Sequence, residues 1–258
     1  MKIYIFSKRV VAVIIVAILV LLGFFTFFTS FTKSFAGITA VFSPQRKLPI
    51  YSVETEEKKV AISFDAAWGD EFTDDILNTL DKYNVKTTFF LVGFWVDKYP
   101  DMVKKIHDRG HEIGNHSSTH PHMSKITREQ IVKELKTTEE KIEAITGIRP
   151  TVFRPPFGDY NNLLIDTAKE LGYHTIQWDV DSLDWKEMGV HAVVDRVSRN
   201  AKKGSIILFH NNAKYVAEYL PLVLEKLQEQ GYEIVPISQL ILHEDYIIDH
   251  SGRQKRVN

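Results

Sequence analysis

Four glycines form the most restrictive pattern in the sequence, because each one follows a segment of helical period and precedes a run of apolar or β-branched residues. They are Gly110, Gly172, Gly204 and Gly231. Glycine adopts the left-handed conformation that ends many helices without the steric cost of a Cβ atom. Helix, glycine and strand repeated four times predict successive β/α units, and such units build a mostly parallel sheet.

The candidate strands of this sheet are seven short runs of apolar and β-branched residues, at 60–65, 87–93, 111–116, 152–157, 175–180, 205–210 and 232–238. One of the helical segments between them begins with Thr127 and Gln130, which have the spacing of a capping box. Seven parallel strands predict an α/β fold of the distorted (β/α) barrel type. An open, doubly wound sheet is the alternative, because periodicity alone does not show closure.

The first 36 residues differ from the rest of the chain. Lys2, Lys8 and Arg9 precede residues 10–28, an uninterrupted run without a charge. This run is long enough to cross a bilayer as a helix, and the basic residues before it predict an N-terminus inside the cell. We therefore expect residues 1–36 to be a cytoplasmic stub and single-pass membrane anchor, with the remainder outside the cytoplasm. The alternative is a signal peptide cleaved after Ala36, which would leave the protein secreted.

The remaining chain divides by composition into three parts. Residues 37–57 lack a clear period and contain a charged run, so we expect a spacer. Residues 58–240 contain all the candidate strands and are the expected β/α domain. Residues 241–258 are polar and are expected to form a frayed C-terminal tail.

Charge and cysteine content exclude several classes of function. Lys and Arg number 32 against 33 Asp and Glu, so there is no basic field to hold nucleic acid, and we expect no nucleic-acid partner. The sequence has no cysteine, so disulfides and thiolate metal sites are excluded. Any metal would be held by His, Asp or Glu.

Polar residues interrupt or end five of the candidate strands. The C-terminal ends of parallel strands meet at one edge of a sheet, and working residues gather there. A buried strand that ends in Asp or His is costly unless the side chain is paired or used. His116 and His120 have the spacing at which two imidazoles on one helical face bind a zinc-type ion. The other residues at this predicted edge are Asp65, Arg154, Asp179, Asp181 and His210.

Five ordered motifs, SFDAAW, HSSTH, RPPFG, DSLDW and IILFH, carry a family resemblance over residues 58–240. In this order they resemble the polysaccharide deacetylases of carbohydrate esterase family 4, the NodB-homology domain. With the apolar N-terminus and the form SFDAAWGDE, the chain is most similar to the sporulation-associated PdaB-type members of spore-forming bacteria. The resemblance implies hydrolysis of N-acetyl groups on amino sugars of cell-wall peptidoglycan, in sporulation or spore-wall maturation.

The resemblance also implies roles for individual residues. Asp65 matches the catalytic base, Arg154 the arginine that orients it, and His210 the general acid, whose acidity Asp184 tunes. Trp185 matches the wall of the sugar groove, and Phe157 and Leu208 match positions that bind the oxyanion and enclose the acetyl methyl. The remaining substrate-binding candidates are Asp181, which shares the polar role of Asp184, and Trp68, which ends the first motif just past Asp65.

One position departs from the family pattern. His116 and His120 match two metal ligands, and the resemblance implies a divalent ion, zinc above all. The third family ligand is a second aspartate in the first motif, where this chain has Ala66. Asp70, four residues further on, is the candidate replacement, and Asp65 itself or a water molecule are the alternatives.

The departure keeps a second function open. A catalytically reduced glycan-binding or spore-wall structural protein would keep the fold and the groove without the metal site. A third reading is a hydrolase of small cyclic amides on the same fold. The predicted anchor favours a polymeric target outside the cell over such small substrates.

Overall fold

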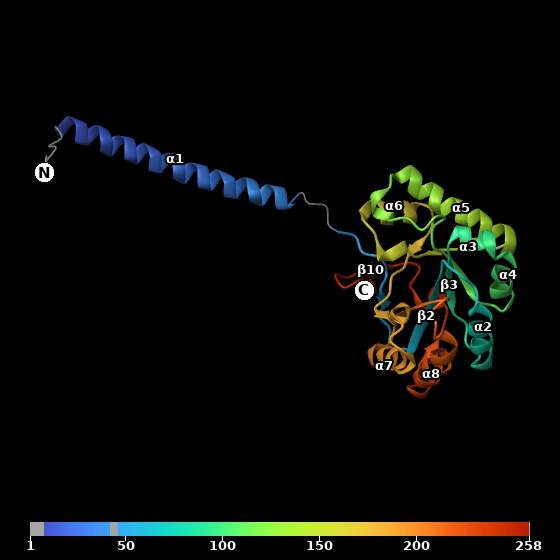
Figure 1. Cartoon of the computed structure of the whole chain (residues 1–258). Coiled ribbons are helices and arrows are strands. Elements are labelled where there is room, and N and C mark those ends of the chain that lie inside the picture. The colour runs from blue at the N-terminus through green and yellow to red at the C-terminus, as the bar shows by residue number, and fades with distance from the viewer. Residues whose placement is uncertain (1–7, 42–45, 258) are drawn as a thin grey trace. The chain divides into compact units, whose positions relative to one another are not determined.

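The computed structural model describes residues 8–41 and 46–257, in two units that divide after Arg46. The first unit contains the helix α1 (Lys8–Val41), and the second, from Lys47 onward, contains every strand in the described ranges (Figure 1). Lys2 of the predicted cytoplasmic stub and residues 42–45 of the predicted spacer lie outside the described residues.

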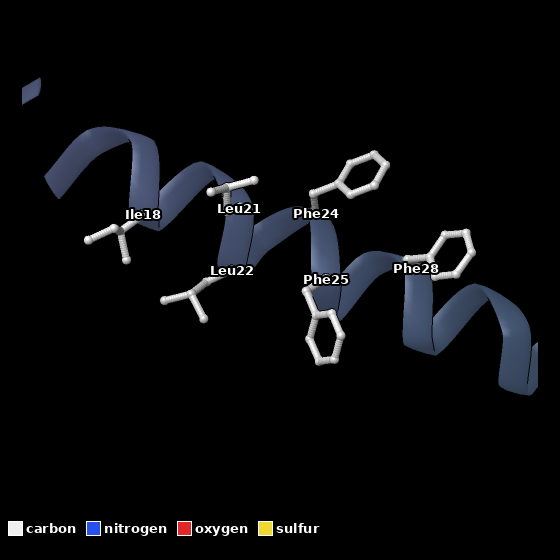
Figure 2. A pocket seen from close by; sticks show the side chains of 6 residues that line it. All are labelled: Ile18, Leu21, Leu22, Phe24, Phe25 and Phe28. Atoms are coloured by element: carbon white, nitrogen blue, oxygen red, sulfur yellow. The ribbon is translucent and has the colours of Figure 1, made fainter. Parts of the chain in front are cut away.

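Helix α1 carries the apolar run. Residues Lys8–Thr29 have a mean hydropathy of 3.2 and are long enough to cross a membrane. Side chains on different sides of the helix are exposed, as Figure 2 shows for Ile18, Leu21, Leu22, Phe24, Phe25 and Phe28. A helix that is apolar all round needs a lipid or buried environment. The segment therefore suits a membrane anchor or a signal sequence.

The second unit is built on a parallel sheet with the order β6-β5-β4-β3-β2-β8-β7, to which β9 adds by pairing with β2. Every pair in this sheet is parallel. The strands are β2 (Lys59–Ala66), β3 (Thr88–Leu91), β4 (Glu112–Asn115), β5 (Val152–Phe153), β6 (His174–Thr175), β7 (Val180–Asp181), β8 (Ile206–His210) and β9 (Glu233–Ile234).

The sheet curls until its two edge strands, β6 and β7, come close together. Thr175 ends β6 and Val180 begins β7, and five residue steps span at most about 17 Å. The prediction of an α/β fold with a distorted barrel of about seven parallel strands is therefore confirmed. In detail, the fifth predicted strand is two strands, because the chain crosses there from one sheet edge to the other. The seventh is shortened to β9, because Pro236 lacks an N–H group and is the N-cap residue of the helix α9 (Ile237–Leu240).

Helices surround the sheet (Figure 1). Alternate strand residues such as Phe64, Phe89 and Phe209 pack outward against them, whereas Ala61, Phe90 and Ile206 belong to a second cluster with Ile237 and Leu240 of α9. The predicted capping box of Thr127 and Gln130 is present at the start of α5. The other helices are α2 (Thr73–Lys82), α3 (Gly93–Lys98), α4 (Pro100–Asp108), α5 (Arg128–Thr146), α6 (Asn162–Glu170), α7 (Val190–Asn200) and α8 (Val216–Glu229), with short 3₁₀ turns at Met123–Lys125, Pro156–Gly158 and Asp184–Lys186.

The segment that follows Arg46 fills the gap between the sheet edges. Ile50 donates its N–H to Thr175 and accepts the N–H of Gln177, at 2.9 and 2.7 Å. Val53 donates to the carbonyl of Gly204, and the approach is so close that a Cβ atom on Gly204 would lie 1.8 Å from the Val53 oxygen. We call residues 47–53 the seam segment. The folded unit thus starts before the predicted domain boundary at residue 58.

The C-terminal residues extend the folded unit at its other end. The strands β10 (Tyr246–Ile248) and β11 (Arg253–Arg256) form a small sheet with β1 (Ser52–Val53), which is part of the seam segment. The buried side chain of Gln254 makes two hydrogen bonds to the backbone of Leu242. The frayed tail expected from the sequence is therefore an ordered strand pair, because partners far away in the chain satisfy its polar groups.

We predict that a chain shortened to begin at Lys58 unfolds at a clearly lower temperature than one that begins at Lys47. Ile50 and Val53 are each 1% exposed, and truncating one buried isoleucine costs about 2–5 kcal/mol. Thermal unfolding of the two chains measures the difference. Glu56→Ala is the matched control, because that side chain is fully exposed and its loss should leave the transition in place. Equal unfolding temperatures would mean that residues 47–57 are only a spacer.

Candidate active site

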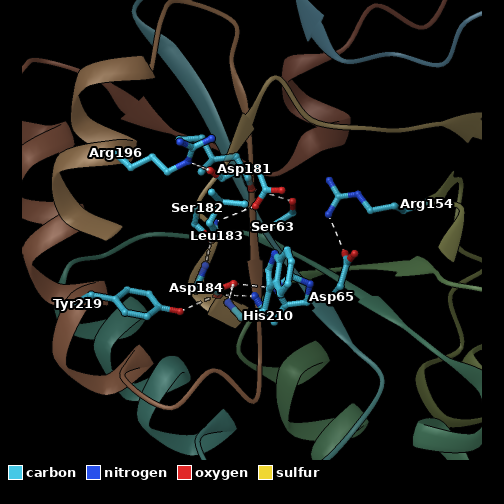
Figure 3. A network of polar contacts seen from close by, with 12 residues as sticks. Ser63, Asp65, Arg154, Asp181, Ser182, Leu183, Asp184, Arg196, His210 and Tyr219 are labelled. Atoms are coloured by element: carbon cyan, nitrogen blue, oxygen red, sulfur yellow. Dashed lines mark hydrogen bonds and ion pairs between the residues drawn. The ribbon is translucent and has the colours of Figure 1, made fainter. Parts of the chain in front are cut away.

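A buried ion pair lies at the C-terminal end of β2. Asp65 is the penultimate residue of β2, and Arg154 directly follows β5. The Arg154 guanidinium is 0% exposed and donates from Nη1 to Asp65 Oδ1 at 2.7 Å (Figure 3). It also donates to the carbonyl of Gln177 and packs over the rings of Phe90 and Trp178. These contacts leave the guanidinium one orientation, so Asp65 is fixed as well.

Two histidines border Asp65. His116 follows β4, and its Nδ1 donates to the carbonyl of Arg154 at 2.7 Å, since a carbonyl only accepts. Its other nitrogen, Nε2, then lies 3.5 Å from Asp65 Oδ2. His120 packs edge-on against His116, with ring centroids 5.1 Å apart. Burial lowers the pKa of His116 and, with the charge of His116, lowers the pKa of His120 to about 4, so both rings are neutral at pH 7.

His210 lies opposite Asp65 across the pairing of β2 with β8. Its Nδ1 donates to Oδ1 of Asp184 at 2.7 Å, so Nε2 is the nitrogen left for chemistry (Figure 3). Asp184 is 2% exposed and also accepts the backbone N–H of His210. This carboxylate therefore fixes both the position and the tautomer of the imidazole.

The two sides of the site have opposite proton affinities. Burial raises the pKa of Asp65, but Arg154, His116 and His210 outweigh burial and hold that pKa below 3.8. Burial lowers the pKa of His210, but the hydrogen bond and charge of Asp184, with Asp65 and Asp181, raise it above 6.5. The site thus favours the ionised form of Asp65, which can accept a proton, and the protonated form of His210, which can donate one. Paired groups with separated pKa values are the pattern of acid–base catalysis.

Exposed aromatic rings surround this pair. Trp68, Phe157 and Trp185 are 57%, 60% and 56% exposed. The rings of Trp68 and Phe157 each pack edge-on against His120, at 5.0 and 4.5 Å. Phe157 has a φ of 59°, a backbone strain of the kind that clusters at functional sites. Trp185 follows Asp184 and donates its backbone N–H to that carboxylate.

Two further predicted substrate residues lie nearby. Leu208 is 3% exposed and lies two residues before His210 in β8, on the same face of the strand. Asp181, at the end of β7, pairs in register with Leu208 and accepts the N–H of Leu183. Its charge acts on both Arg154 and His210. The sequence-predicted residues Asp65, His116, His120, Arg154, Asp181, Asp184 and His210 therefore gather at one end of the sheet.

The predicted metal ligand Asp70 does not join them. Its charge acts on Lys98, and within residues 8–41 and 46–257 its carboxylate has no contact with His116 or His120. Ala66 is fully buried in the apolar layer between sheet and helices. No group of three or more His, Asp or Glu in the described part of the chain is arranged to hold a metal. The two histidines thus fall short of the three protein ligands of a catalytic zinc site.

Three supporting residues had no role in the sequence analysis. Glu134 of α5 accepts the backbone N–H groups of Ser118 and Thr119, so it clamps the loop between the two histidines. Asn115 fixes the same loop through the N–H of Ser117. Tyr219 of α8 donates its hydroxyl to Asp184 at 2.8 Å. Each of the three lies in a helix or strand outside the five motifs. No sequence signal therefore distinguished it from an ordinary core or surface residue.

We predict that Asp184→Asn lowers the pKa of His210, because the substitution removes the hydrogen-bonded charge that raises it most. Titration of the His210 ring by NMR measures the change without any substrate. Asp181→Asn should lower the pKa less, since that carboxylate acts only through space. A His210 pKa that is unchanged in Asp184→Asn would contradict the electrostatic account.

Comparison with known proteins places this geometry in a family. Residues 52–176 match the family model of polysaccharide deacetylase. The chain is 36% identical to the peptidoglycan-N-acetylglucosamine deacetylase of Bacillus cereus, over 74% of this chain and 92% of that protein. It is 37% identical to the uncharacterized protein YlxY of Bacillus subtilis, over 75% of this chain and 60% of that one.

A solved structure of the same fold comes from Bacillus anthracis and is a CE4 family pseudoenzyme. The TM-score is 0.73 at 35% identity, covering 84% of this chain and 72% of that one. The chain spans only 40% to 60% of the length of the first curated relatives that it matches. Identity of this extent over most of the folded unit, together with the matching fold, shows the family: the chain belongs to the polysaccharide deacetylases of carbohydrate esterase family 4.

Proposed function

We propose that the protein hydrolyses N-acetyl groups on amino sugars of peptidoglycan. The observation that carries this proposal is the pair formed by Asp65, with its lowered pKa, and His210, with its raised pKa, on neighbouring strands. Amide hydrolysis needs a base to activate water and an acid to protonate a poor amine leaving group. Relatives with 34% to 36% identity include peptidoglycan deacetylases that act on N-acetylglucosamine and on N-acetylmuramic acid.

In this mechanism, the Asp65 carboxylate accepts a proton from water as the water oxygen attacks the acetyl carbonyl carbon. Arg154 keeps the carboxylate turned toward that water. Breakdown of the tetrahedral intermediate breaks the bond from carbon to nitrogen, and His210 Nε2 delivers its proton to the departing amine. Acetate and a free amino sugar leave, and the two side chains exchange the net proton with solvent.

The substrate groove of the proposal uses the exposed rings. Trp185 offers an indole face against which a sugar ring packs, and Trp68 and Phe157 offer rings on the His120 side. Leu208 supplies an apolar wall for the acetyl methyl, and Asp181 a polar contact. Exposed aromatic rings that gather around one site are a normal feature of a binding surface.

The location of the substrate follows from α1. We propose that residues 47–257 lie outside the cytoplasm, where peptidoglycan lies; the hydropathy of Lys8–Thr29 supports this whether α1 is an anchor or a signal sequence. A role in sporulation, as in PdaB-type members, is the finer part of the proposal. It rests on the SFDAAWGDE motif and the apolar N-terminus.

The second candidate is a glycan-binding protein with little or no catalysis. Ala66 favours it, since the histidine pair lacks its third family ligand. A related structure is a CE4 family pseudoenzyme, and a mutant of that protein has restored enzymatic activity. Such a protein would keep the aromatic groove and lose only the turnover.

We predict that Asp65→Asn and His210→Ala each lower kcat for acetate release about 10²–10⁴-fold, because each group acts mainly in the transition state. Glycan binding should persist in both variants, whereas Trp185→Ala should weaken binding. His243→Ala is the matched control, because this exposed ring is hydrogen-bonded to Ser238. The binding-protein alternative predicts no acetate release by the native protein, with any metal, and glycan affinity that is indifferent to Asp65→Asn.

We predict that Ala66→Asp tightens zinc binding by about 10-fold or more, equivalent to about 1.4 kcal/mol. A buried carboxylate is costly without a cation, so the variant should also unfold earlier than the native chain in chelator and regain stability with zinc. Ala67→Asp controls for an added carboxylate at the neighbouring position. Zinc affinity that is equal in native chain and Ala66→Asp would mean that Asp70 or another group already completes the site.

We predict that protease added to intact protoplasts that express the full chain cleaves the folded unit. Retention in the membrane fraction would indicate an anchor, and release into the medium would indicate a cleaved signal sequence. Complete protection from protease in intact cells, lost on lysis, would contradict the proposed orientation.

A further inference from the structure

The Asp184 carboxylate accepts four hydrogen bonds. Oδ1 accepts from His210 Nδ1 and from the backbone N–H of Trp185, at 2.7 and 2.8 Å. Oδ2 accepts from the backbone N–H of His210 and from the hydroxyl of Tyr219, both at 2.8 Å. Two of these donors belong to His210, the residue that Asp184 positions, and one belongs to Trp185, the residue after Asp184. Only the Tyr219 hydroxyl comes from a separate element, the helix α8, and Figure 3 shows it on the side of Asp184 away from Asp65.

Tyr219 has little freedom to move. Its side chain is 1% exposed, and its ring stacks on Phe209 at 5.6 Å with an interplanar angle of 19°. Phe209 in turn stacks on Phe64, and both lie on the strands that carry His210 and Asp65. The packed rings of Phe209 and Phe64 therefore hold the Tyr219 ring in one rotamer, and its hydroxyl stays at Asp184 Oδ2.

We propose that Tyr219 is a positioning residue that holds the Asp184 carboxylate in the orientation in which it supports His210. The hydroxyl binds Oδ2, so that Oδ1 stays directed at the imidazole. It also takes up part of the carboxylate's charge, so that Asp184 binds the imidazolium less strongly than a carboxylate with one fewer donor would. The part of the inference that concerns proton delivery rests on the proposed function.

The charges around His210 give the sign of the effect. Asp184, Asp65 and Asp181 face His210 and favour its protonated form, while burial opposes it, and His116 lies close enough to sense its charge. Among these groups Tyr219 interacts with Asp184 alone. Removing the hydroxyl leaves a buried carboxylate short of one donor, which makes it a stronger base. The His210–Asp184 pair should then retain its shared proton to higher pH.

The test is Tyr219→Phe in the full chain, which keeps the ring in its stack and removes only the hydroxyl. NMR titration of His210 should show a higher pKa than in the native chain, the opposite direction to Asp184→Asn. In the Asp184→Asn background, Tyr219→Phe should change nothing further, because its partner is gone. For acetate release, kcat should fall about 10-fold, with KM within about twofold, because a weaker acid delivers the proton more slowly.

Tyr173→Phe is the matched control. Tyr173 is also buried and also donates to a buried carboxylate, that of Glu139 at 2.7 Å. Its hydroxyl accepts a hydrogen bond from Asn115 as well, but the charge of Glu139 is not among those that act on His210. Loss of this hydroxyl should destabilise the fold to a similar extent and leave the pKa of His210 unchanged. An unchanged His210 pKa in Tyr219→Phe, or an equal shift in Tyr173→Phe, would overturn the inference.

The two readouts separate this inference from the proposed function. A shifted His210 pKa in a protein that releases no acetate would keep the positioning role and reject the deacetylase. Acetate release that is unaffected by Tyr219→Phe, with an unshifted His210, would reject the positioning role and keep the deacetylase.

Discussion

The buried ion pair between Asp65 and Arg154 is the interaction on which the rest of the site depends. Placing a guanidinium with no solvent exposure is costly unless its charge and its donors are satisfied. Asp65 supplies the charge and Gln177 a carbonyl for the two terminal nitrogens, whereas the buried Nε has no hydrogen-bond partner in the described part of the chain. Gln177 is itself hydrogen-bonded to Ile50 of the seam segment. The carbonyl of Arg154 also receives the Nδ1 proton of His116. The seam segment, the sheet edge and His116 are thus linked through a single residue, Arg154.

The same sheet produces two opposite electrostatic environments a strand apart. On β2, the guanidinium of Arg154 overrides burial and keeps Asp65 ionised. On β8, burial lowers the pKa of His210, but the carboxylate of Asp184, with Asp65 and Asp181, outweighs it and raises that pKa. Because Asp65 and His210 are direct neighbours across the strands, each also favours the charged form of the other. The opposite proton affinities of Asp65 and His210 therefore come from the neighbouring charges of Arg154 and Asp184. The strands hold the two residues in register.

Sequence patterns anticipated the features that depend on local chemistry. Asp65 and His210 end apolar runs, and parallel strands bring such ends together, so their convergence was predictable. The features that escaped prediction depend on contacts between distant segments. Ile50 lies in a run that has no strand period, and its partners Thr175 and Gln177 are more than a hundred residues away. Gln254 looks like a solvated tail residue until its contacts with Leu242 are known, and Tyr219 occupies a core position of an amphipathic helix.

The most direct test of the account is the pH dependence of acetate release by the native chain from N-acetylated peptidoglycan, with and without added zinc. The account predicts turnover that persists well below pH 6.5, because Asp65 stays ionised there, and that declines only as the pH rises through the raised pKa of His210. Binding to the glycan without acetate release at any pH, under either metal condition, would contradict the central claim and identify the protein as a glycan-binding relative of the deacetylases.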